Sequence, residues 1–159
     1  IASALLLHLL GVQATHVPYR GSAAAFQDLA AGRISFQSDT ISFLAPHIRE
    51  GRVIGVVIGT PQRMPMAPDV PTSAEAGLPA YQATTWTPWS APLGTPIPIR
   101  QFLYEQIATA LRDPAVRERL LQLGNTIPEG VTPDATRAFI ASELERWVPV
   151  VRASGARVD

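Results

Sequence analysis

The sequence predicts an α/β fold, with an open, mostly parallel sheet followed by a strand-and-helices segment that has too few strands to form a sheet of its own. Helical and strand patterns alternate over about the first eighty residues, joined by short links. Residues 53–58 are a β-branched apolar run, typical of a strand buried on both faces of a parallel sheet. Beyond residue 82 the pattern gives one strand and then mostly helices. We therefore expect two parts, residues 1–81 and 82–159.

The first predicted element is a helix over residues 1–10. Gly11 should end it, because glycine readily adopts the left-handed conformation that follows helices. An extended run over 14–17 and a turn follow. Ser22 is the predicted N-cap of the next helix, residues 23–31.

Residues 34–38 alternate apolar and polar side chains, which is the period of a strand. Asp39 or Thr40 is expected to cap a helix over residues 41–50, and Gly51 to end it. The order helix, strand, helix, strand, helix, strand indicates crossover units on a parallel sheet.

Residues 60–71 are dense in proline and predict a loop. Thr72 and Glu75 have the spacing of a capping box, which predicts a helix kept short by Gly77 and Pro79.

The second part begins with an extended segment, residues 81–91, that contains Trp86. Three proline-marked helix starts follow, at Thr95-Pro96, Asp113-Pro114 and Thr132-Pro133. Pro149 lies inside the last apolar stripe and should kink or end that helix.

Composition excludes several kinds of protein. The chain has 159 residues, 47% of them apolar, and no net charge, so it lacks the basic surface that nucleic-acid binding needs. It has no cysteine, which excludes disulfides and thiolate chemistry. No apolar run approaches the roughly 18 residues of a membrane span. A start on Ile1, inside a helix, suggests a truncated or processed sequence.

No pattern for catalysis or cofactor binding is present. The three histidines, His8, His16 and His47, share no metal-binding spacing, and the sequence contains no P-loop, nucleophile elbow or dinucleotide fingerprint. We predict no catalytic residue, no metal site and no cofactor.

Binding residues are better represented. Ligands of open parallel sheets bind beyond the carboxyl ends of the strands. Here those ends lead into helix N-termini, where free N–H groups and the helix dipole favour anions. The predicted ligand-binding residues, all at these positions except the last, are Tyr19, Arg20, Gly21, Ser22, Asp39, Thr40 and Trp86.

Each of these residues also has a purely structural interpretation. Ser22 and Asp39 could serve only as helix caps, and Arg20 could be a solvated turn residue. Trp86 fits core or interlobe packing better than a ligand platform.

Together, several segments resemble one family. Val17-Pro18-Tyr19-Arg20-Gly21 with Asp28-Leu29 and Gly32, then Val70-Pro71-Thr72 with Glu75 and Gly77-Leu78-Pro79, are similar to motifs of the Bug-type periplasmic receptors of tripartite tricarboxylate transporters. Gly94-Thr95-Pro96, and Phe139, Glu143 and Trp147 in the last helix, resemble further motifs of the family. The resemblance covers nearly the whole chain in the expected order.

This resemblance implies a periplasmic binding protein fold of type 2, with two lobes that close around a small carboxylic acid. It implies a C-terminal portion whose N-terminal half is missing: residues 1–81 as the second lobe and 82–159 as the return segment. It further implies a periplasmic location and a membrane permease as partner.

Two other functions remain open from the residues. One is a sensory protein of the same fold that passes its ligand signal to a partner. The other is an α/β enzyme acting on a small acid, against which the lack of any nucleophile–base or metal pattern argues.

Overall fold

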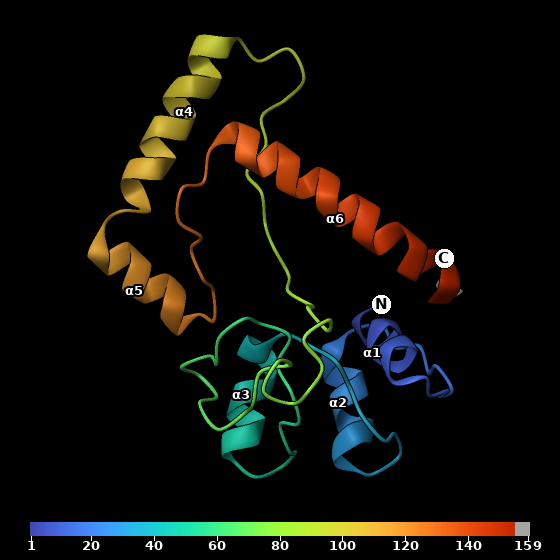
Figure 1. The fold of residues 1–159 in the computed structure, drawn as a ribbon. Helices are drawn as coiled ribbons and strands as arrows, with labels where there is room; N and C mark the ends of the chain where they lie inside the picture. Colours follow the sequence, from blue (N-terminus) through green and yellow to red (C-terminus); the bar gives the residue numbers. More distant parts are fainter. Residues whose placement is uncertain (155–159) are drawn as a thin grey trace. The chain divides into compact units, whose positions relative to one another are not determined.

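The computed structural model describes residues 1–154, which form six helices and contain no strand (Figure 1). Two compact units are present: residues 1–85 with residues 150–154, and residues 86–149. The helices of the first unit are α1 (Ala2–Leu10), α2 (Ser22–Ala30) and α3 (Ile41–Arg49). Those that follow are α4 (Ile97–Ala110), α5 (Pro114–Gln122) and α6 (Pro133–Ser154).

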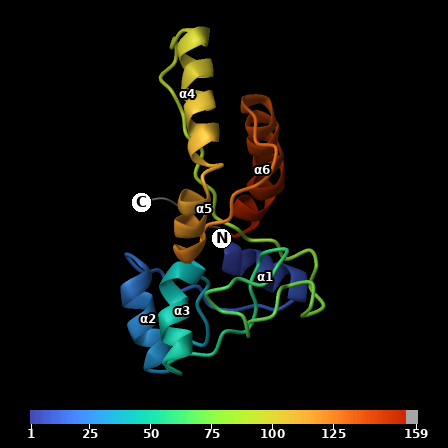
Figure 2. The same ribbon diagram turned by 90° about the vertical axis from the view of Figure 1, so that its left-hand side faces the viewer.

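The core of the first unit forms where α2 packs against α3, and the two helices lie side by side in Figures 1 and 2. Phe26 of α2 is 2% exposed and stacks on the His47 ring of α3, with ring centres 3.8 Å apart. Phe43 meets both rings edge-on. The Arg52 guanidinium lies 4.8 Å from the centre of the Phe26 ring and donates a hydrogen bond to Nδ1 of His47. These contacts fix the spacing of the two helices.

Glycine ends two of the predicted helices as expected. Gly11 has φ 64° and follows α1, and Gly51 has φ 67° just beyond α3. The cap of α2 was predicted wrongly. Gly21 holds the N-cap position and Ser22 is already helical, with no side-chain cap. Gly21 has φ 132°, which glycine tolerates and a serine at that position would not.

The predicted strands 34–38 and 53–58 are not formed in the described residues. A single parallel bridge joins Ile58 to Thr72, with Ile58 donating to the Pro71 carbonyl at 2.9 Å. Ile54 and Val56 are 89% and 73% exposed, so the run is not buried on both faces. A strand needs neighbouring strands to satisfy its backbone, and none lies beside this run.

The proline-rich segment after this bridge is ordered by local contacts. Glu75 accepts from the Thr72 N–H at 2.7 Å, and the Thr72 hydroxyl accepts from the Glu75 N–H at 3.2 Å, which confirms the capping box. The residues that follow form turns, so the short helix predicted there is absent. Arg63 donates to both Glu75 oxygens, at 3.1 and 2.9 Å, and to the Pro68 carbonyl.

The second unit has no apolar core, although side chains cap the starts of α5 and α6. Asp113 accepts from the N–H groups of the first turn of α5, and the Thr132 hydroxyl accepts from Ala135 at the start of α6, both as predicted. Glu143 is the one buried side chain among residues 86–149. The helix α6 continues past Pro149 to Ser154, so the predicted early end is wrong. Apolar residues of α4 such as Phe102 stay exposed.

Candidate functional site

Tyr19 is held by α2 and does not stand free. Its hydroxyl donates to Asp28 at 2.7 Å, and Arg33 pairs with the other oxygen of the same carboxylate. The hydrogen bond to Asp28 is the main reason why the pKa of Tyr19 is raised above its ordinary value. The Tyr19 hydroxyl is therefore already engaged, and it ties the turn before α2 to Asp28 of that helix.

The turn itself presents Arg20 and Gly21. Arg20 is exposed and makes no hydrogen bond or ion pair with any residue of the described part. A Cβ on Gly21 would meet nothing within 4 Å, so the space beside this residue is open. No side chain within residues 1–154 caps α2, which leaves the N–H groups of its first turn available to an anion.

Asp39 and Thr40 lie at the start of α3, as predicted. Thr40 is the N-cap by position, but its side chain does not cap the helix. The Thr40 hydroxyl instead accepts from Ser42 at 3.3 Å. Asp39 accepts from the Thr40 N–H at 2.8 Å, so one of its oxygens is turned toward its own backbone.

Gln37 links these two helix starts, and the sequence reasoning missed it. Its side-chain nitrogen donates to Asp39 at 2.7 Å and, more weakly, to the Ser22 carbonyl at 3.4 Å. Its Oε1 atom is buried without a hydrogen-bond partner among the described residues. The only signal in the sequence was a polar residue two positions before Asp39. The structure thus links the starts of α2 and α3 through Gln37, although the sheet whose edge was predicted to bring them together is absent from residues 1–154.

Trp86 belongs to the other compact unit, residues 86–149. Its indole N–H donates to Glu143 of α6 at 3.1 Å, and Trp147 donates to the same oxygen at 3.0 Å. The Phe139 ring meets Trp86 edge-on, with centres 5.5 Å apart. Arg146 pairs with the second Glu143 oxygen at 3.1 Å. These contacts favour the structural interpretation of Trp86, as packing against α6.

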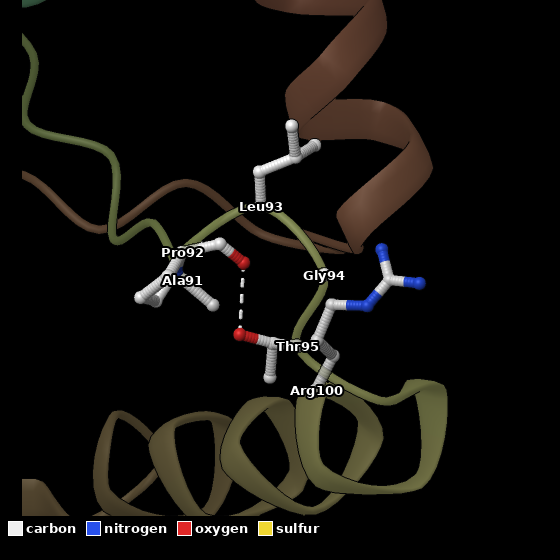
Figure 3. Close-up of a pocket in the computed structure, with 6 residues that line it drawn as sticks. All are labelled: Ala91, Pro92, Leu93, Gly94, Thr95 and Arg100. Atoms are coloured by element: carbon white, nitrogen blue, oxygen red, sulfur yellow. Dashed lines mark hydrogen bonds between the residues drawn. The ribbon is translucent and has the colours of Figure 1, made fainter.

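A hollow of about 350 Å³ lies in the second unit, where the chain turns into α4 (Figure 3). Thr95 closes the turn, donating through both its hydroxyl (2.8 Å) and its N–H (3.1 Å) to the Pro92 carbonyl. Arg100 is the one charged residue of its lining, and Leu93 is fully exposed at its edge. An open hollow of this kind does not enclose a small ligand as binding pockets do, so we do not assign the site here.

Within residues 1–154, no group of three or more potential metal-binding side chains occurs. None of the helices in this part of the chain combines the length and apolarity needed to cross a membrane.

Comparisons with known proteins converge on one family. Residues 2–156 match the tripartite tricarboxylate transporter family receptor. BugT of Bordetella pertussis is 38% identical over 148 residues, which are 93% of this chain and 45% of that protein. The chain therefore spans about half the length of this relative.

Solved structures agree. MatC from Rhodopseudomonas palustris, with bound malate, is 39% identical, with a TM-score of 0.76 over 94% of this chain and 52% of that one. A second R. palustris protein, solved with adipate, is 32% identical, with a TM-score of 0.80 over 97% of this chain and 51% of the other. The periplasmic binding protein BugD is 28% identical, with a TM-score of 0.77 over 97% of this chain and 52% of that one, which confirms the fold class in its coarse form. The chain belongs to the family of tripartite tricarboxylate transporter receptors.

Proposed function

We propose that this chain is the ligand-holding part of a periplasmic receptor that captures a small carboxylic acid and delivers it to a tripartite transporter permease. The main support is that two relatives of the same fold, at 39% and 32% identity, were solved with malate and adipate bound. Both ligands carry two carboxylates, so a dicarboxylic acid is the leading candidate.

The acid binds at the start of α2 in this proposal. The uncapped first turn offers N–H donors to one carboxylate, and Arg20 adds a positive charge with no competing partner within residues 1–154. The open space beside Gly21 lets the ligand approach the backbone. Asp39 and Thr40, at the start of α3, supply acceptors for a ligand hydroxyl or water.

The lobe assignment belongs to the same proposal. We assign residues 1–81 to the second lobe and 82–159 to the segment that completes the first. The lack of buried apolar side chains in residues 86–149 supports this, because such helices need an apolar surface to pack against. The relatives, about twice as long, contain enough chain to supply it.

The test is isothermal calorimetry on the complete gene product against malate, adipate, monocarboxylates, a sugar and a peptide. We expect the dicarboxylates to bind, and Arg20→Gln to weaken them by on the order of tenfold, since it removes a charged contact. Arg49→Gln is the matched control, because Arg49 is exposed at the far end of α3 and has no partner among the described residues. Binding of the sugar or peptide alone would contradict the ligand class.

A further inference from the structure

Gln37 is the side chain that joins the two proposed ligand-binding segments. It lies fifteen residues from Ser22 and two from Asp39, and its side-chain nitrogen contacts both, at 3.4 and 2.7 Å. Both contacted atoms are acceptors: one is the Ser22 carbonyl oxygen and the other an Asp39 carboxylate oxygen. The amide orientation is therefore fixed, because the reversed amide would turn its own oxygen toward two other oxygens.

This orientation has a cost. The Gln37 oxygen is buried and has no donor among the described residues. Buried acceptors without partners are rare, because they lose their hydrogen bonds to water and gain none in return. The two hydrogen bonds that the Gln37 amide donates, to the Ser22 carbonyl and to Asp39, therefore offset this loss.

The hydrogen bond from Gln37 affects how the negative charge of Asp39 acts on the ligand site. Asp39 is an anion close to the place where a carboxylate is proposed to bind, and two like charges repel. Each of its oxygens accepts a hydrogen bond from the protein, one from Gln37 at 2.7 Å and one from the Thr40 N–H at 2.8 Å. These donors direct the carboxylate toward the protein and offset part of its negative potential.

We infer that Gln37 is a positioning residue of the ligand site, which holds Asp39 turned toward the protein and ties the start of α3 to the start of α2, so that an anionic ligand can approach. The inference rests on the proposed function. It assigns Gln37 no contact with the ligand, since it acts through Asp39 and Ser22.

The test exchanges donor and acceptor. Gln37→Glu places a second carboxylate against Asp39, while Gln37→Glu combined with Asp39→Asn restores one donor and one charge in the opposite order. Gln106→Glu is the control, because it adds the same charge on the exposed side of α4, where Gln106 has no partner within residues 1–154. Calorimetry with malate, a dianion, and lactate, a monoanion with the same hydroxyl, measures binding to the complete gene product. Thermal melting of each variant without ligand measures how much the hydrogen bond between positions 37 and 39 contributes to stability.

We expect Gln37→Glu to weaken the binding of malate about tenfold and the binding of lactate less, because the added repulsion scales with the charge of the ligand. The double variant restores the hydrogen bond between positions 37 and 39 but not the one to the Ser22 carbonyl, so it should recover part of the lost affinity for both acids and part of the lost melting temperature. Equal losses for malate and lactate, a double variant no better than the single one, or an unchanged Gln37→Glu protein overturns the inference. If the unaltered protein binds no acid at all, the proposed function fails, and failure of the exchange to restore the melting temperature separately refutes the Gln37–Asp39 link.

Discussion

Replacing Glu143 tests whether a buried carboxylate organises the second unit. Glu143 is 7% exposed and accepts from Trp86 and Trp147 while pairing with Arg146. Hydrogen bonds to a charged group contribute roughly 1.5–3 kcal/mol each. The ion pair adds little, because the Arg146 side chain is 38% exposed and stays solvated when its partner is removed. Trp86 is 41% exposed and its N–H can turn to water, which reduces the loss. We expect Glu143→Ala to lower the free energy of unfolding by about 3 kcal/mol.

Glu143→Gln separates shape from charge. The glutamine oxygen can still accept from both indoles, but its NH₂ group would face Arg146, so the expected loss is smaller, about 1–2 kcal/mol. Glu145→Ala is the control, since Glu145 is exposed and unpaired within the described residues, and should change stability by less than about 0.5 kcal/mol.

Urea unfolding followed by circular dichroism and by tryptophan fluorescence measures these losses. The fluorescence signal reports directly on the two indoles that contact Glu143. A Glu143→Ala loss no larger than that of Glu145→Ala, or equal losses for Ala and Gln at position 143, would refute the reasoning.

Three further predictions concern single residues. Gly59→Ala should destabilise the first unit by more than about 2 kcal/mol, because a Cβ there would lie 2.7 Å from the Ala83 nitrogen. Gly130→Ala has open space around the added Cβ and should cost only about 1–2 kcal/mol, from its positive φ. Urea unfolding compares the two variants. The pKa of Glu75 is lowered, chiefly by its hydrogen bond from Arg63, so its ionised form adds stability that is lost as the pH falls below the ordinary glutamate range; Glu75→Gln should flatten the acid side of a plot of melting temperature against pH. Asp113→Ala should cost about 0.5–2 kcal/mol and lower the helix signal of α5 in circular dichroism.

Several short-range signals in the sequence were confirmed, although the Ser22 cap and the short helix after Thr72 were not. Gly11 and Gly51 end their helices, Asp113 caps α5, and Thr72 and Glu75 form their reciprocal pair. In each case the partner atoms lie within one turn of the same segment, so the residue types alone decide the geometry.

Long-range contacts could not be predicted in this way. The run 53–58 has the composition of a buried strand, yet it stays irregular, since a strand exists only where other strands pair with it. Nothing near Gln37 in the sequence announces the Ser22 carbonyl fifteen residues away, and Trp86 meets Glu143 across 57 positions.

The sequence by itself therefore determined where the described helices lie, the caps of α5 and α6, and the family, because these depend on local spacing and on motifs kept in order. The tertiary structure alone decided which polar groups meet. It placed Gln37 between Ser22 and Asp39, and it brought the Trp86 indole to the Glu143 carboxylate. Hydrogen bonds between distant segments form only once packing has brought their donors and acceptors within about 3 Å.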